Sequence, residues 1–234
     1  MRRVVRGFWG PRQESAEELA ARWSTMLDRF ARLLPQVAGT WRTAPASGPA
    51  EVLQPDEPSL LTALRTARTV DGWSAADGTS LRLLAENAAP GWKVEIAALA
   101  GGTPEYLLQS LVTTIVSPDG APDLPDAELL TAVAESWHPD YGDVSDRAVT
   151  SALKKEAGFR IGTPSVGWVG YLSAGRAART PAASFPGGRT LPTGGVLLTI
   201  APPGDTATVV EAYQALRDSG ALEPLPHPMT RPAL

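Results

Sequence analysis

The clearest hydrophobic pattern in the chain has the period of an α-helix and lies in residues 16–34. Its apolar side chains recur at steps of three and four, which places them on one face: Leu19, Trp23, Met26, Leu27, Phe30, Leu33 and Leu34. Ser15 and Glu18 have the S-x-x-E spacing of a capping box, and Pro35 stops the pattern. We therefore expect an amphipathic helix laid across the strand that precedes it.

Alternation of apolar and polar residues is the second pattern, and it predicts strands. This alternation occurs in residues 2–9, 81–86, 92–98 and 107–116. The last of these four segments has a higher apolar content than the others. Gly10 and Pro11 end the first strand, because proline has no N–H to donate to a ladder. Alternating runs joined by tight turns favour an antiparallel meander with one solvent-facing side.

The rest of the chain follows the same two patterns. Helices are expected over residues 59–68, 126–137, 149–157 and from residue 206 or 208 to 220, with Ser59 and Thr206 or Thr208 as caps. Strands are expected over residues 167–172 and 196–200. The second of these is a continuous apolar run, typical of a central strand buried on both faces. Residues 43–58 and 174–195 are rich in proline and glycine and are expected to be loops.

This order of elements predicts one α+β domain over residues 1–222, with an antiparallel or mixed β-sheet and helices packed on its faces. Composition does not divide the chain into two cores. Residues 223–234 contain four prolines, and we expect them to form a flexible tail.

Composition excludes several kinds of chemistry. The chain has no cysteine and two histidines, so thiolate chemistry and a multi-histidine metal site are excluded within one chain. The net charge of −4 does not favour binding to nucleic acid or to an anionic membrane. No apolar run reaches the roughly 20 residues of a membrane span, and we expect a cytoplasmic protein.

Acidic residues are concentrated between residues 119 and 146. This window contains eight of them and no lysine or arginine, so it carries −8 against −4 for the whole chain. The simple interpretation is a solvated surface. The functional interpretation is a docking surface for a basic partner, because complementary charge speeds association and rejects wrong partners.

A metal site in this window is the alternative that most resembles an enzyme. His138, Asp140, Asp143 and Asp146 lie close together in the sequence, and oxygen ligands can surround a hard cation. The twelve-residue calcium-loop pattern is not met, because no glutamate falls at its last position. Glycine-rich phosphate loops and a serine-nucleophile elbow are also missing from the sequence. We therefore expect no metal, no cofactor and no catalytic residue.

Five of the seven tryptophans have a position in the pattern that suggests a role. Trp9, Trp23, Trp92 and Trp168 fall on faces of predicted strands or helices and are expected in the core. Trp137 ends a predicted helix beside acidic residues, and it has two interpretations: a side chain that fills the core, which is favoured, or an anchor for a binding partner.

Three stretches resemble a known family. The run Gly7-Phe8-Trp9-Gly10-Pro11-Arg12, followed by Glu14-Ser15-Ala16-Glu17, resembles the opening of the bacterial family called Immunity protein 52. The run from Val166 to Ser173, with Gly167, Trp168 and Tyr171, resembles its second signature, and Trp137-x-Pro139-Asp140 resembles a third. The glycine, tryptophan and tyrosine residues that the chain shares with this family look structural.

The resemblance implies a cytoplasmic antidote in a polymorphic toxin system. Such a protein binds one cognate toxin domain, often a nuclease of restriction-endonuclease-like fold, and blocks it without catalysing a reaction. The family's toxin-contacting residues do not carry over to named positions in this chain. A metal-dependent hydrolase and a small-molecule-binding α+β module are the rival interpretations, and the oligomeric state stays open.

The acidic window gives the expected docking site. We place the partner on the segment from Trp137 to Asp146, with Asp140, Asp143 and Asp146 as contacts and Trp137 or Tyr141 as the aromatic anchor. A nuclease binds a polyanion, so its active cleft should be basic, and carboxylates can occupy it in place of phosphates.

Overall fold

The computed structural model describes residues 1–37, 39–44, 49–86, 88–180 and 187–234. Within this part of the chain, ten strands form one sheet in the order β3-β2-β4-β5-β6-β1-β7-β8-β10-β9. Every described strand pairing is antiparallel. The prediction of a single-domain α+β fold is confirmed, and the sheet is antiparallel rather than mixed.

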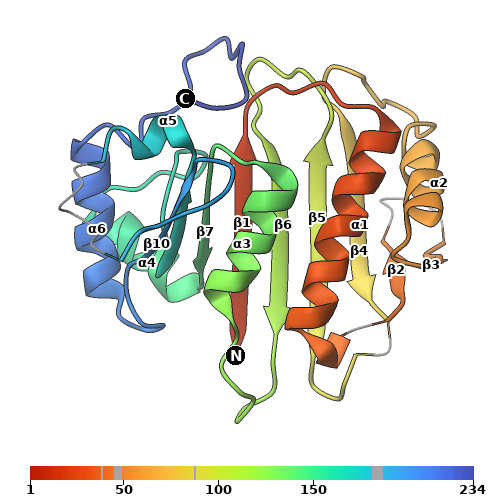
Figure 1. Cartoon of the computed structure of the whole chain (residues 1–234), viewed down its shortest axis with the longest axis horizontal. Helices are drawn as coiled ribbons and strands as arrows, with labels where there is room; N and C mark the ends of the chain where they lie inside the picture. The colour runs from red at the N-terminus through yellow and green to blue at the C-terminus, as the bar shows by residue number, and fades with distance from the viewer. Residues whose placement is uncertain (38, 45–48, 87, 181–186) are drawn as a thin grey trace.

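The first strand, β1 (Arg2–Trp9), lies in the middle of the sheet (Figure 1). It pairs with β6 (Gln109–Val116) on one side and β7 (Tyr141–Ser145) on the other. Its alternating residues Arg3, Val5, Gly7 and Trp9 are buried, while those between them are half-buried or exposed. The alternation read from the sequence is therefore the alternation of the two sheet faces.

The predicted meander is confirmed as β4 (Thr79–Ala85), β5 (Lys93–Ala100) and β6. Leu83, Ile96 and Thr113 lie in register on one face and are fully buried. Their neighbours on the opposite face are half-buried or exposed, as expected for a sheet with one wetter side.

Helices α1 (Ala16–Leu33) and α3 (Asp126–Trp137) lie across one face of the sheet, and α2 (Glu57–Ala67) packs beside α1 (Figure 1). Ser15 and Glu18 form the predicted capping box at the start of α1. Helices α4 (Arg147–Glu156) and α6 (Thr206–Asp218) pack together at the other end of the sheet. Two predicted caps are corrected: Asp56, not Ser59, caps α2, and Asp205 caps α6.

The outer strands are short: β2 (Trp41–Thr43), β3 (Val52–Leu53), β8 (Val169–Leu172), β9 (Arg189–Thr190) and β10 (Val196–Thr199). The prediction that residues 196–200 form a central strand is wrong, because β10 lies next to the sheet edge and Thr199 is exposed. The expected loop of residues 174–195 also contains a single-turn helix, α5 (Ala174–Ala177). A 3₁₀ turn at Pro35–Val37 follows α1. Parts of the expected loops, residues 45–48 and 181–186, lie outside the described residues.

The C-terminal segment differs from the expected flexible tail. Leu225 and Met229 are buried, and the Gly10 amide donates to the Pro232 carbonyl at 2.8 Å. The Leu234 amide donates to Asp140 Oδ1 at 3.0 Å. The prolines prevent regular secondary structure but not packing, because buried apolar side chains and these hydrogen bonds attach the segment beside the end of β1.

Candidate partner-binding surface

The acidic segment predicted as the docking site is not an exposed loop. Residues Tyr141–Ser145 form β7, and all five are buried between β1 and β8. Asp143 lies opposite Arg6 in the strand register and accepts from its Nε and Nη2 atoms at 2.9 and 2.6 Å. Ser165 also donates to Asp143, at 3.0 Å. The expectation that Asp143 is exposed to a partner is therefore wrong.

Asp140 is equally internal. Its carboxylate accepts from Arg176 Nη2 at 2.6 Å, from Ser173 Oγ at 3.0 Å and from the Leu234 amide at 3.0 Å. The side chains of Asp140 and Arg176 are both inaccessible to solvent. Asp146 caps α4 by accepting from the Val149 amide at 2.9 Å. These carboxylates hold elements of the fold together, and their engagement explains why the sequence carries them.

The two predicted anchors, Trp137 and Tyr141, belong to the core. Trp137 stacks on Trp9 with 5.6 Å between ring centroids and meets Trp23 edge-on at the same distance. Tyr141 stacks on Phe8 at 5.2 Å, and burial raises the pKa of its phenol. The core interpretation of Trp137 is the correct one.

Arginine side chains from other parts of the chain form ion pairs with acidic residues of the window. Arg3 lies 3.4 Å from Asp126, Arg29 pairs with Glu135, and Arg6 and Arg176 pair with the aspartates of β7 and its approach. Burial raises the pKa of Asp126, although Trp168 Nε1 donates to it at 2.7 Å. Asp119, Asp123 and Glu128 are the members of the window that stay exposed. Four of the eight acidic residues of the window are therefore paired with arginines inside the fold.

The proposed metal ligands do not assemble into a site. His138 ends α3 in the left-handed conformation, with φ 46°, while Asp140 and Asp143 point to different arginines. No group of three or more potential histidine or carboxylate ligands is found within the described ranges. The metal-dependent hydrolase thus gains no support from these residues.

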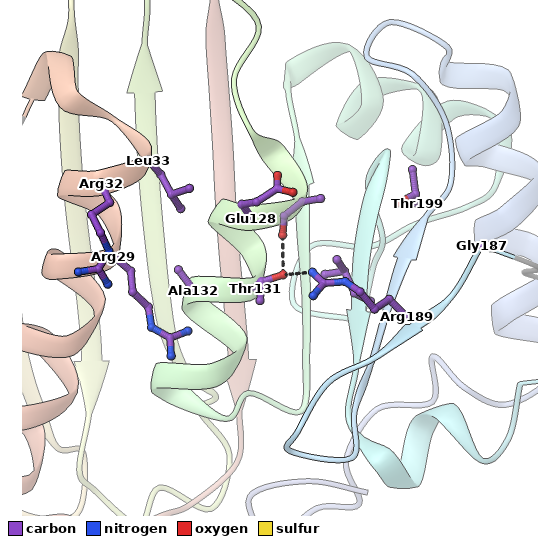
Figure 2. A pocket seen from close by; sticks show the side chains of 11 residues that line it. Arg29, Arg32, Leu33, Glu128, Thr131, Ala132, Gly187, Arg189 and Thr199 are labelled. Carbon is purple, nitrogen blue, oxygen red and sulfur yellow. Dashed lines mark hydrogen bonds between the residues drawn. The ribbon is translucent and has the colours of Figure 1, made fainter.

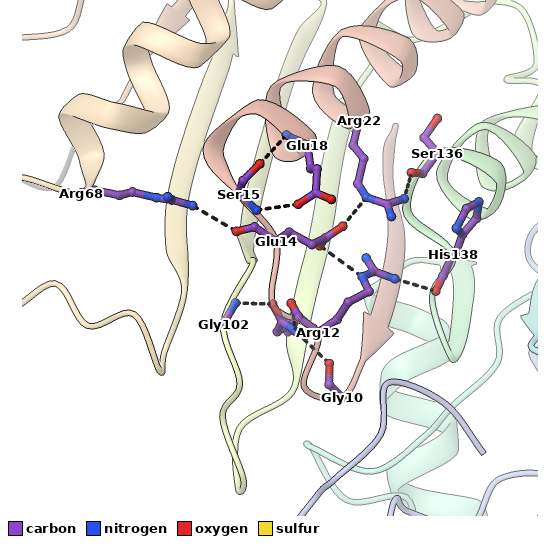
Figure 3. Close-up of polar contacts among 11 residues, drawn as sticks. Gly10, Arg12, Glu14, Ser15, Glu18, Arg22, Arg68, Gly102, Ser136 and His138 are labelled. Atoms are coloured by element: carbon purple, nitrogen blue, oxygen red, sulfur yellow. Dashed lines mark hydrogen bonds and ion pairs between the residues drawn. The ribbon is translucent and has the colours of Figure 1, made fainter.

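The first signature stretch connects β1 to α1 through a polar network (Figure 3). Glu14 is buried and pairs with both Arg12 and Arg22. Arg12 donates to the His138 carbonyl at 3.3 Å, and Arg22 donates to the Ser136 carbonyl at 2.6 Å. The network therefore connects the start of α1 to the end of α3, and sequence reasoning did not identify it.

The glycines of the two signatures lie at close backbone contacts. A Cβ atom at Gly10 would overlap the Arg231 carbonyl oxygen, and one at Gly167 would overlap the Val144 carbonyl oxygen. A Cβ at Gly7 would come within 3.1–3.3 Å of Val133 and Pro139. Trp168 is buried beneath the guanidinium of Arg3, 4.7 Å from its ring centroid. These positions contribute to packing and are not available on the surface.

One hollow of about 730 Å³ lies between α1, α3 and the β9–β10 end of the sheet (Figure 2). Arg29, Arg32 and Arg189 line it together with Glu128. Arg29 is paired with Glu135, and Arg189 donates to Thr131 Oγ1 at 2.8 Å. Because the charges are mixed and partly engaged, this hollow does not select one class of ligand.

A second hollow of about 670 Å³ lies between α2, the turn segment of residues 70–78 and strands β2 to β5. We call it the α2–Trp73 groove. Val52, Val70 and Trp73 line it with exposed apolar surface, and Glu51, Asp71 and Asp77 lie on its rim. The sequence signal for this surface was weak: Trp73 stands between two Asp-Gly turns and belongs to no periodic apolar pattern.

Comparison with known proteins assigns the chain to a family. The family model described as Immunity protein 52 matches residues 4–211, and the chain therefore belongs to this family of immunity proteins. A solved structure of the Pseudomonas aeruginosa T6SS protein PA0821 has a similar fold, with a TM-score of 0.54 and 15% sequence identity. The match covers 95% of this chain and 73% of that one. The comparison with curated proteins gives no match.

None of the helices described is both long and apolar enough to cross a membrane.

Proposed function

We propose that this protein neutralises a cognate toxin domain by binding it directly and stoichiometrically, without catalysing a reaction. Membership of an immunity-protein family is the observation that carries the proposal. The side chains weaken the metal-dependent hydrolase as a rival, because the aspartates that it would use are engaged in ion pairs and a helix cap inside the fold.

We further propose that the toxin is a nuclease and that the protein acts in the cytoplasm, where such a toxin would meet its substrate. A nuclease must hold a polyanion, so the surface that an antidote blocks is expected to be basic. The exposed carboxylates of the α2–Trp73 groove are compatible with such a partner. The structural neighbour is a T6SS protein, which is compatible with a role of this chain in a toxin system linked to secretion.

The first experiment is co-expression with the product of the adjacent gene, with growth as the readout. Rescue by the wild-type chain is expected, together with a complex that survives gel filtration. A titration of purified toxin then separates binding from catalysis, since a stoichiometric inhibitor abolishes toxin activity at an equimolar endpoint. Inactivation by far less than one equivalent would indicate an enzyme. Failure of soluble wild-type protein to rescue growth would contradict the proposed pairing.

A small-molecule-binding module remains the second candidate, because two hollows of about 730 and 670 Å³ fall in the usual size range for ligand sites. A ligand that binds only the folded state raises the unfolding temperature. A thermal-shift screen against small molecules would support this candidate if one compound gave a saturable shift that Trp73→Ala abolished.

A further inference from the structure

Exposed apolar side chains gather in the α2–Trp73 groove rather than being scattered. Of seven large exposed hydrophobic residues in the described part of the chain, three line this one hollow: Val52 at 58% exposure, Val70 at 49% and Trp73 at 38%. Single exposed apolar residues are ordinary, but a contiguous patch with a polar rim is typical of an interaction site. Tryptophan in particular is enriched among the residues that dominate binding energies.

The aromatic side chain is held in position before any partner arrives. The guanidinium of Arg68 lies 5.7 Å from the centroid of the Trp73 ring. Arg68 is itself fixed by donation to Thr79 Oγ1 at 2.9 Å and to the Glu14 carbonyl at 3.3 Å. A ring that is already oriented loses less conformational entropy on binding than a free one.

The turn that carries Trp73 is also tied to the sheet. The Gly78 amide donates to the Ser74 carbonyl at 3.0 Å, and the Thr103 amide donates to the Ala76 carbonyl at 2.8 Å. Gly78 has a φ of 95°, a region that other residues rarely adopt, and a Cβ there would lie 2.6 Å from the Ala100 carbonyl oxygen. The groove wall therefore has a defined backbone rather than a freely moving one.

The rim of the groove is acidic. Glu51, Asp71 and Asp77 are exposed, and none of them forms an ion pair within the part of the chain that the structure describes. Arg82 also lines the groove, but its guanidinium pairs with Glu95 at 2.6 Å. Arg68, against the Trp73 ring, has no carboxylate partner among the described residues. The groove therefore presents three carboxylates and this one cation around an apolar floor. Because negative charge is in excess, its complement is a cationic surface with an apolar centre.

We propose that the α2–Trp73 groove docks a basic segment of the toxin domain, in which lysine or arginine side chains flank an apolar side chain that packs on Trp73. This inference rests on the proposed function and names the contact surface that it requires. The apolar side chain supplies burial against Trp73 and Val70, while the flanking cations meet Asp71, Asp77 and Glu51. Nucleic acid is a poor occupant, because its phosphates would face the same carboxylates.

The test measures affinity for the purified product of the adjacent toxin gene. Trp73→Ala is expected to raise the Kd at least about 30-fold, as for a central anchor of an interface. Tyr106→Ala is the matched control, since Tyr106 is also exposed, at 71%, but lies outside the groove. Both variants should keep the wild-type unfolding temperature, because neither side chain belongs to the buried core.

The charges are tested separately with a pair of triple variants. Glu51→Gln, Asp71→Asn and Asp77→Asn together should slow association and flatten its salt dependence. The matched control neutralises three exposed carboxylates outside the groove: Asp119→Asn, Asp123→Asn and Glu128→Gln. Groove variants that bind like wild type, or a control that weakens binding as much, would overturn the assignment of this surface. A second copy of the chain as occupant would show instead as a dimer that Trp73→Ala dissociates, and this result would also overturn it.

If the product of the adjacent gene does not bind the wild-type protein, that result counts against the proposed function alone. The groove is then tested directly with a peptide. A short peptide of alternating leucine and lysine is titrated against the full chain, with a leucine–glutamate peptide as control. Saturable binding of the lysine peptide, lost in Trp73→Ala, supports the groove as a site for basic apolar segments. Equal binding of both peptides, or binding of neither, rejects it.

Discussion

The guanidinium of Arg176 donates to the carboxylate of Asp140 across 2.6 Å, and both side chains are closed to solvent. Arg176 also donates to the carbonyls of Ala221 and Glu223, at 2.7 and 2.8 Å. One buried charge pair and its neighbouring hydrogen bonds therefore join the approach to β7, helix α5 and the segment that follows α6. Its strength depends on both charges remaining present, because an isolated buried ion is costly.

This geometry predicts a large effect of Asp140→Asn on stability. The change leaves the Arg176 charge buried without its counter-ion and is expected to cost about 3–5 kcal/mol of unfolding free energy. The matched control is Arg179→Ala, which removes a pair with the exposed Glu223 and is expected to cost less than about 1 kcal/mol. Urea denaturation measures both. Similar losses for the two variants would contradict the buried-pair interpretation.

Because these aspartates are engaged inside the fold, substituting them would not test the acidic window as a docking surface. Replacement of Asp140, Asp143 and Asp146 together removes two partners of arginines and one helix cap. A loss of toxin binding in that variant would therefore reflect loss of the fold. Substitutions at Asp119, Asp123 and Glu128 test the exposed charge of the window without this complication.

A second prediction concerns the aromatic cluster under α1. Trp23 is 1% exposed and meets the Trp137 ring edge-on, with ring planes at 89°. Trp23→Ala should leave a cavity beneath α1 and cost about 3–5 kcal/mol. Chemical denaturation gives the value, and Trp73→Ala is the control because its ring is partly exposed. A wild-type midpoint for Trp23→Ala would mean that the helix face is wrongly placed.

Sequence reasoning predicted the elements that depend on local pattern. The capping box and apolar stripe of α1, the alternation of β1 and the β4–β6 meander are all properties of neighbouring residues. They follow from helix and strand periodicity, and for that reason the fold class could be predicted without any long-range information.

Pairing between distant residues could not be predicted in the same way. Asp143 and Arg6 are 137 residues apart, and Asp140 and Arg176 are 36 apart, so counting charge in a window treats engaged carboxylates as free ones. The position of β10 near the sheet edge depends on strand order, which hydrophobicity does not encode. The α2–Trp73 groove is likewise formed by α2, a turn and four strands that only the tertiary fold brings together.

A third prediction concerns the C-terminal segment. Removal of residues 223–234 exposes the surface beneath Leu225 and Met229. It also takes away several hydrogen bonds, among them those from Gly10 to Pro232, from Leu234 to Asp140 and from Arg176 to Glu223. Burial of two such side chains is worth roughly 1.5–3 kcal/mol each, so truncation should lower the unfolding temperature clearly. Differential scanning calorimetry measures the shift. An unchanged unfolding temperature would show that the segment behaves as the free tail that its prolines suggest.

The last prediction concerns pH and His138. His138 is exposed, but partial desolvation at the end of α3 lowers the pKa of its imidazole from the usual value of 6.5. Arg22 and Arg12 lower this pKa further, against the opposing effects of Glu135 and Glu14. A base whose pKa is lower in the folded state stabilises that state fully above pH 6.5, and this contribution is lost as the pH falls below it. Acidification through this range should therefore destabilise the wild-type chain through His138.

His138→Asn is the variant that isolates this effect. Asparagine tolerates the left-handed backbone conformation found here, with φ 46°, so the end of α3 should be preserved while the titrating group is removed. Unfolding temperatures of both proteins are measured at several values between pH 7.5 and pH 5.5. The difference between the two curves should shift in favour of the variant as the pH falls, because protonation of His138 beside Arg12 and Arg22 places a third positive charge at the end of α3. Parallel curves over the whole range would show that His138 titrates alike in the folded and unfolded chains.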